Sequence, residues 1–162
     1  MSLKIIHTAD WHLGQTFFGY DRDEEHEAFL SWLIDILTLR QTDVLLIAGD
    51  VFDVANPSAA AQRRFFRFLR EANRHNPQLQ IVIIAGNHDS AARLEAPIPL
   101  LEELNTSIVG VVPRTDLCKI DFDSLLIPLY NKEGKREAIC LAVPYLRQGD
   151  YPASKEGKDT YV

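Results

Sequence analysis

Three short apolar runs, each followed at once by polar residues, constrain the fold of this chain more than any other feature of its sequence. The runs lie at residues 3–7, 43–48 and 80–85, and segments with helical spacing of apolar residues lie between them at 22–40 and 57–75. Such runs are typical of strands buried on both faces of a parallel sheet, where helices form the crossovers. The order strand, helix, strand, helix, strand (βαβαβ) therefore predicts an α/β fold.

The chain beyond residue 90 carries a weaker pattern. Pro97 and Pro99 interrupt a helical segment, because proline removes a helix hydrogen bond. The elements predicted in this region are a broken helix at 94–105, short strands at 107–112, 118–122 and 138–143, and a turn at 131–137.

Composition limits the class of protein. A length of 162 residues suits one ordinary domain, and an apolar fraction of 46% allows a sizeable core. The net charge of −6 argues against a module that coats DNA by bulk positive charge. It does not argue against a metalloenzyme acting on phosphates, because acidic ligands hold cations and cations hold phosphate. Two cysteines cannot make a disulfide framework and no run suits a membrane span, so a cytoplasmic protein is expected.

The polar residues that follow the three runs are types that bind metals. They are Asp10 and His12 after the first run, Asp50 and Asp53 after the second, and Asn87, His88 and Asp89 after the third. The carboxyl ends of parallel strands meet at one sheet edge, so these side chains are predicted to converge. Carboxylates and an imidazole suit Mn²⁺, Fe²⁺ or Zn²⁺.

Each residue of this predicted centre has a chemical role available to it. Asp50 can bridge two cations, and the amide oxygen of Asn87 can ligate a cation without adding charge. His88 can protonate a leaving oxygen or stabilise charge in a transition state. Any one of these motifs alone would more commonly be a turn or a helix cap. Their recurrence at three successive strand ends favours a joint metal site.

These motifs resemble a known family. Asp10-x-His12, Gly49-Asp50-Val51-Phe52-Asp53 and Gly86-Asn87-His88-Asp89 are similar to the first three motifs of the calcineurin-like metallophosphoesterases. The flanking residues 7–15 and 143–147 further resemble the family of bacterial SbcCD exonuclease D subunits, which belong to the double-strand-break repair nucleases. The resemblance implies a phosphoesterase β-sandwich with flanking helices, of which this chain is the N-terminal part.

The resemblance also implies an activity. A member of this family hydrolyses phosphodiesters at DNA ends and hairpins with two divalent metals, most often Mn²⁺, during DNA repair, recombination and replication. It works with an ABC-type ATPase subunit (SbcC-like) and forms a homodimer through helices that here correspond to residues 57–75 and 91–104.

The family's site roles transfer to matching positions of this chain. By the motifs, Asp10 and His12 bind the first metal, Asp50 bridges, and Asn87 binds the second metal. His88 matches the catalytic histidine. Asp53 is expected to be catalytic as well, at a position where archaeal and eukaryotic relatives often carry histidine.

One departure from the family pattern is plain in the sequence. The family supplies further ligands from later Gly-His and Gly-His-x-His motifs, but no histidine follows His88 in this chain. Residues 1–162 are therefore expected to be the N-terminal portion of a nuclease domain, without the later ligand motifs and any DNA-capping domain. We expect at most one well-held metal and little nuclease activity from this chain alone.

Two further functional interpretations remain open. One is a non-catalytic fragment that serves in dimerisation or partner binding. The other is a phosphoesterase of the same superfamily that acts on phosphomonoesters or cyclic nucleotides.

Basic residues form a stripe on the segment 57–75. Its members are Arg63, Arg67, Arg70 and Arg74. They follow helical spacing, so they share one face. This face either contacts DNA phosphates or is an ordinary solvated surface, and the second interpretation is favoured.

Several other residues receive structural interpretations. Trp32 is expected in the core, and His7 is expected to be a packing residue at the end of a strand. His26 and His75 are expected at the surface or in a helix cap. Cys118 and Cys140 are expected to be buried small side chains and not ligands.

Overall fold

A four-stranded parallel sheet forms the centre of the molecule. The computed structural model describes residues 2–115, 119–147 and 150. The sheet strands are β1 (Ile5–Thr8), β4 (Val44–Ala48), β5 (Gln80–Ile84) and β6 (Thr106–Val109). They are hydrogen-bonded in the order β1-β4-β5-β6, all parallel. The α/β fold predicted from the alternation of elements is confirmed.

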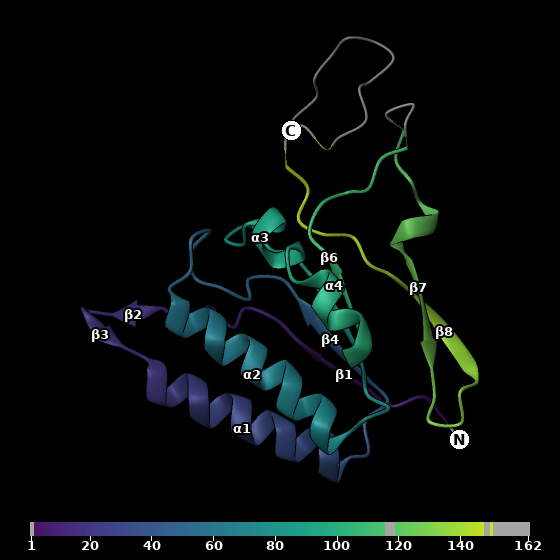
Figure 1. Ribbon diagram of the computed structural model, residues 1–162, viewed down its shortest axis with the longest axis horizontal. Helices are drawn as coiled ribbons and strands as arrows, with labels where there is room; N and C mark the ends of the chain where they lie inside the picture. Colours follow the sequence, from purple (N-terminus) through teal and green to yellow (C-terminus); the bar gives the residue numbers. More distant parts are fainter. Residues whose placement is uncertain (1, 116–118, 148–149, 151–162) are drawn as a thin grey trace.

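Both faces of this sheet are covered, which explains why the strand sequences are continuously apolar. Helices α1 (Asp23–Leu39) and α2 (Ala59–His75) lie side by side along one face, and the hairpin of β7 (Leu126–Tyr130) and β8 (Arg136–Leu141) lies on the other (Figure 1). Successive strand side chains alternate between two buried clusters: Leu45 packs with the helices, while Val44 packs with the hairpin. This second layer of strands agrees with the expected β-sandwich.

The two long helices begin where local chemistry favours a helix start. Helix α1 has three acidic residues in its first turn, which suit the positive end of the helix dipole. Helix α2 is capped by Ser58, whose Oγ accepts the backbone N–H of Ala61 at 3.1 Å. An unpredicted contact joins the helices: buried Arg64 bonds Asp23 at 2.8 Å and Glu27 at 3.1 Å.

Short elements complete the described chain. They are the hairpin β2 (Thr16–Phe17) and β3 (Tyr20–Asp21), helices α3 (Ala91–Glu95), α4 (Ile98–Leu101) and η1 (Glu102–Leu104), and the turn η2 (Asp123–Leu125). The broken helix at 94–105 is confirmed, because α3, α4 and η1 divide that region between them. No helix of the described residues combines the length and apolar character needed to cross a membrane.

The prediction of strands beyond residue 110 was partly wrong. In place of a strand at 118–122, Ile120 forms one isolated bridge with Arg114, and Cys118 lies outside the described residues. Strand β7 was missed because Pro128 lies in its middle, which argues against a strand unless it is at an edge. The turn at 131–137 is confirmed: Asn131 Oδ1 accepts the backbone N–H groups of Glu133 and Lys135.

Three predictions about individual side chains were also wrong. Trp32 is 55% exposed, and the buried tryptophan is Trp11, which packs edge-on against Phe68 at a centroid distance of 5.1 Å. His7 is exposed, since β1 is an edge strand of the sheet. His26 is only 6% exposed, and its Nδ1 has no hydrogen-bond partner among the described residues. His75 is exposed as expected, and Cys140 is half-buried.

Burial of His26 predicts a dependence of stability on pH. Desolvation lowers the pKa of His26, and the nearby positive charges of Arg22 and Arg64 lower it further. The unfolded chain binds a proton near the ordinary value of 6.5 while the folded chain does not. The free energy of unfolding should therefore decline as pH falls below about 6.5, until the lower folded pKa is passed.

Denaturation with urea at pH 7.5 and 5.5 tests this prediction. The His26→Gln variant should lose less free energy of unfolding between these two pH values than the native chain loses. His75→Gln, at the exposed end of α2, is the matched control and should keep the native slope. Equal slopes for the native chain and the His26→Gln variant would contradict the prediction.

Candidate metal and catalytic centre

The loops that follow β1 and β4 are joined backbone to backbone. The N–H of Asp10 donates to Gly49 O at 3.1 Å, and the N–H of His12 donates to Asp50 O at 3.0 Å. Asp10, His12 and Asp50 have φ angles of 56°, 46° and 48°, in the left-handed region. Aspartate and histidine tolerate this conformation better than most residues. The strained backbone turns their side chains out of the sheet edge together.

Asp10, His12 and Asp50 each contribute one ligand atom to a cluster in which all such atoms lie within 4.8 Å of one another. Asp50 is 7% exposed, and its Oδ2 lies 3.8 Å from His12 Nε2. A buried carboxylate in such a place needs a positive partner. The two carboxylates and one imidazole are a donor set that fits one divalent transition metal.

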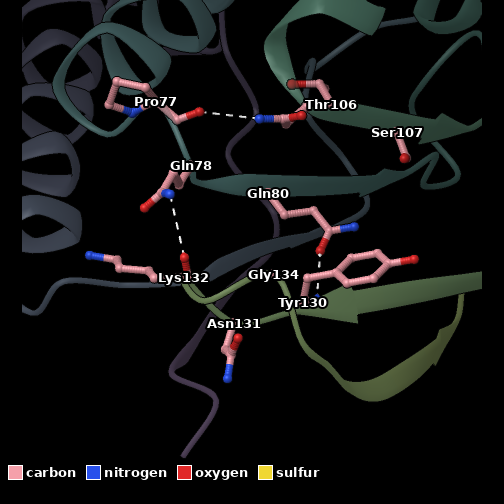
Figure 2. Close-up of a pocket in the computed structure, with 10 residues that line it drawn as sticks. Pro77, Gln78, Gln80, Thr106, Ser107, Tyr130, Asn131, Lys132 and Gly134 are labelled. Carbon is pink, nitrogen blue, oxygen red and sulfur yellow. Dashed lines mark hydrogen bonds between the residues drawn. The ribbon is translucent and has the colours of Figure 1, made fainter. Parts of the chain in front are cut away.

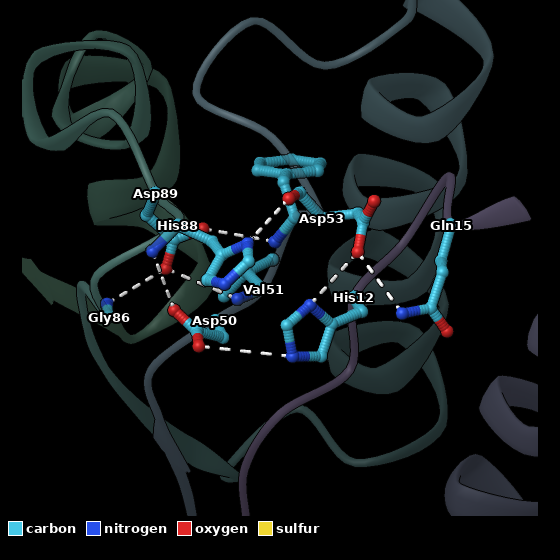
Figure 3. Close-up of polar contacts among 9 residues, drawn as sticks. His12, Gln15, Asp50, Val51, Asp53, Gly86, His88 and Asp89 are labelled. Carbon is cyan, nitrogen blue, oxygen red and sulfur yellow. Dashed lines mark hydrogen bonds and ion pairs between the residues drawn. The ribbon is translucent and has the colours of Figure 1, made fainter.

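Asp53 orients the ring of His12. Its Oδ1 lies 3.2 Å from His12 Nδ1 and also accepts the Gln15 Nε2–H at 3.2 Å (Figure 3). An ionised carboxylate only accepts hydrogen bonds, so the His12 proton must be on Nδ1. This leaves the Nε2 lone pair free on the side of Asp50. A carboxylate that holds the far nitrogen of a metal-binding histidine is a recurring outer-shell arrangement.

His88 lies against His12, with ring centroids 4.9 Å apart. Its backbone N–H donates to Asp50 Oδ1 at 2.9 Å, and its Nδ1 donates to the backbone oxygen of Asp53 at 2.7 Å. That hydrogen bond raises the pKa of His88, and the carboxylates of Asp50, Asp53 and Asp89 add to the effect. The Nδ1–H of His88 is thus occupied by its bond to the backbone oxygen of Asp53, and Nε2 is the ring nitrogen that can contact a substrate.

Asn87 is exposed and follows β5. It lines a pocket of about 310 Å³ together with Asp10 and Asp50. The residues predicted to converge therefore share one edge of the sheet. Asp50 and Asn87 are the two predicted ligands that the described chain offers to a second cation.

Asp89 is a residue of this centre whose role sequence reasoning missed. Its side chain is buried, and its two oxygens accept the backbone N–H groups of Val51 at 3.2 Å, Phe52 at 3.0 Å and Gly86 at 2.9 Å. One carboxylate thus ties the loop after β4 to the loop after β5 (Figure 3). The motif Gly-Asn-His-Asp was the available signal, but partners nearly 40 positions away could not be identified from it.

Gly86 lets these two loops approach each other. A Cβ atom at this position would overlap the Oδ1 and backbone nitrogen of Asp50 and lie 2.7 Å from its Cγ. The absence of a side chain at residue 86 is therefore what makes room for the Asp50 carboxylate.

The arginine stripe on α2 is largely paired with acidic side chains. Arg67 bonds Glu27 at 2.9 Å, while Arg70 and Arg74 bond Glu71 at 3.0 and 3.1 Å. This partial neutralisation favours the interpretation as a solvated face, and a DNA contact by Arg63 and its neighbours stays a prediction.

A larger pocket, of about 500 Å³, lies at the amino-terminal ends of β5 and β6. Figure 2 shows that its amide side chains bond to the protein itself: Gln80 Oε1 accepts the backbone N–H of Tyr130 at 3.3 Å, and Gln78 Nε2 donates to Lys132 O at 3.4 Å. None of the metal-competent clusters found in the described part of the chain lies there. The candidate centre is thus at the opposite end of the sheet.

Comparison with known proteins agrees with this geometry. Residues 3–148 match the family model described as calcineurin-like phosphoesterase. The chain is 48% identical over 157 residues to the D subunit of the nuclease SbcCD from Rhodobacter capsulatus, covering 97% of this chain and 38% of that protein. It is 35% identical over 158 residues to the corresponding protein of Escherichia coli K12, covering 96% of this chain and 36% of that protein. The chain thus spans less than two fifths of the length of these relatives.

Proposed function

Because the chain belongs to the calcineurin-like phosphoesterase family, we propose that it is the N-terminal portion of a metal-dependent DNA phosphodiesterase. The observation that carries the proposal is the cluster of Asp10, His12 and Asp50 with His88 beside it. The relatives are named as D subunits of the nuclease SbcCD, which supports a nuclease that works within a complex. We infer that the partner is an ABC-type ATPase and that the substrates are DNA ends and hairpins.

Each residue of the candidate centre has a proposed role in phosphodiester hydrolysis. Asp10, His12 and Asp50 would hold one divalent cation, for which we propose Mn²⁺, and Asp50 with Asn87 would face a second. Such cations supply Lewis-acid activation of a phosphate ester and of a water molecule. Asp53 keeps the proton of His12 on Nδ1, so that Nε2 stays a ligand.

His88 is proposed to be the proton donor. Its Nδ1–H is held by the Asp53 backbone oxygen, so a protonated ring presents its second N–H, at Nε2, to a leaving oxygen. The raised pKa of His88 keeps this form populated to higher pH than for an ordinary histidine. In this role His88 is catalytic, and Asp53 acts as a positioning residue through its contacts with His12 and His88.

We propose a homodimer formed through α2, α3 and α4. Leu100 in α4 is 79% exposed, which a contact between two copies would explain. The alternative is that the chain serves in dimerisation or partner binding without catalysis.

A titration with Mn²⁺, followed by calorimetry, tests the metal site in this chain. We expect one well-held ion per chain. Asp50→Asn should lower the Mn²⁺ affinity of the chain. The loss should exceed the roughly 10- to 100-fold loss that follows replacement of a residue that only supports a metal ligand. Asp35→Asn, an exposed acid on α1, is the matched control and should leave the affinity unchanged. Two tightly bound ions, or an unaltered affinity in Asp50→Asn, would contradict the assignment.

An assay of the intact protein with Mn²⁺ tests the reaction. Hydrolysis of a DNA hairpin and of a 4-nitrophenyl phosphodiester, both lost in His88→Asn, is the expected result. Hydrolysis of a 4-nitrophenyl phosphomonoester without any diester cleavage would favour a different phosphoesterase of the family.

A further inference from the structure

The segment after β8 crosses the candidate centre, and we propose that Tyr145 on this segment stacks on the nucleotide base next to the phosphodiester that is cleaved. Tyr145 would thus determine the preference for nucleotide-bearing substrates. This inference rests on the proposed function, which supplies the DNA substrate.

Tyr145 lies at the same pocket as the predicted metal ligands. The pocket of about 310 Å³ is lined by Asp10, Asp50 and Asn87 and also by Val143, Pro144 and Tyr145. A phosphodiester held near the acidic residues would therefore place its neighbouring nucleoside within reach of Tyr145.

The segment is anchored by two hydrogen bonds to the chain around the end of β5. The N–H of Tyr145 donates to Ala85 O at 2.8 Å, at the end of β5. Two residues later, Arg147 Nη2 donates to the backbone oxygen of Asp89 at 2.8 Å. Pro144, just before Tyr145, is buried and has a restricted φ. The backbone of Tyr145 is thus fixed beside Ala85, two residues before Asn87.

The side chain of Tyr145 is half-exposed at this pocket. Its exposed fraction is 52%, so about half of its surface is free to meet a ligand. A large aromatic side chain kept half-exposed on an anchored segment is typical of a contact surface and not of a core residue.

The charge of the centre favours an uncharged contact of this kind. The pocket walls carry Asp10 and Asp50, which repel the phosphates of DNA when no cation is bound. Base stacking on an aromatic ring adds affinity without electrostatics and tolerates every base, because each base has a π face.

Paired substrates test the proposal in the intact protein with Mn²⁺. Thymidine 5′-(4-nitrophenyl phosphate) and methyl 4-nitrophenyl phosphate share the scissile diester and leaving group, but only the first carries a nucleoside. Tyr145→Ala should lower kcat/KM for the thymidine ester relative to kcat/KM for the methyl ester by about tenfold. Most of this effect should be a higher KM for the thymidine ester. Tyr145→Phe should keep the native ratio. Tyr130→Ala, a half-exposed tyrosine at the far pocket, is the matched control and should also keep it.

Fluorescence gives a second readout that does not depend on turnover. An oligonucleotide with 2-aminopurine beside the cleavage position should be quenched on binding in the presence of Ca²⁺, because stacking quenches this base. The quenching should persist in Tyr145→Phe and be lost in Tyr145→Ala. An unchanged kcat/KM ratio together with unchanged quenching would overturn the role of Tyr145. If the native protein hydrolyses neither diester, the proposed function fails, and the quenching alone decides whether Tyr145 contacts a base.

Discussion

Replacing Gly86 with alanine is expected to abolish tight metal binding by this chain, although only one methyl group is added. The new Cβ would overlap the carboxylate and the backbone nitrogen of Asp50. Neither group can move without a cost in free energy, because Asp50 Oδ1 accepts the backbone N–H of His88 and Asp50 is buried. We expect Mn²⁺ affinity to fall at least 100-fold, beyond what outer-shell changes usually cost. Overpacking should also lower the free energy of unfolding by about 1–3 kcal/mol.

Gly134→Ala is the matched control for this substitution. Gly134 lies in the turn between β7 and β8, and a Cβ there would meet nothing within 4 Å. Its φ of +73° makes alanine unfavourable by about 1–2 kcal/mol, but without any effect on the metal centre. Calorimetric titration with Mn²⁺ and urea denaturation of both variants provide the comparison. Retention of native affinity in Gly86→Ala would show that the two loops are not packed as described.

Replacing Asp89 with asparagine is expected to destabilise the fold by about 3 kcal/mol, since hydrogen bonds to a charged group are worth roughly 1.5–3 kcal/mol each. The carboxylate is 1% exposed and accepts three backbone N–H groups. An asparagine amide has the same shape but turns one acceptor into a donor, so a buried N–H would face another N–H.

The loss in Asp89→Asn should lower the melting temperature by several degrees, because each kcal/mol is worth about 2–4 °C in a domain of this size. Thermal and urea denaturation can be followed by the fluorescence of Trp11, which is buried beneath the site. Asp35→Asn, at an exposed position of α1, should change the free energy of unfolding by less than about 0.5 kcal/mol. If Asp89→Asn also changes the free energy of unfolding by less than about 0.5 kcal/mol, the Asp89 carboxylate does not hold the loops after β4 and β5 together.

The parallel strands were predictable because their signal is local. Each run of apolar residues is complete within five or six positions, and the crossover helices leave a parallel sheet as the arrangement that covers both faces. The proximity of Asp10, His12 and Asp50 follows from that topology, since strand ends meet at one edge. Strand β7 was not predictable in this way, because its proline is tolerated only through a position at the sheet edge.

The exposure of three individual side chains was not predictable from local pattern. His26, Arg64 and Trp32 all lie on amphipathic helices, and their exposure depends on which side chain of the neighbouring helix lies opposite. Arg64 is buried because Asp23 and Glu27 of α1 meet it there. Trp32 is exposed because α2 packs along another face of α1, where Leu30, Leu33 and Leu37 are buried.

The amino-acid sequence by itself determined the α/β class, the family and the identity of the residues at the strand ends, since each depends on neighbours along the chain. Only the tertiary structure decided that Asp53 holds the ring of His12, that Asp89 joins two loops, and that Tyr145 lines the same pocket as Asp10 and Asp50. The physical reason is that hydrogen bonds and pocket walls are made between atoms brought together in space. His12 and Asp53 lie 41 positions apart and Val51 and Asp89 lie 38 positions apart, so no local pattern specifies these pairs.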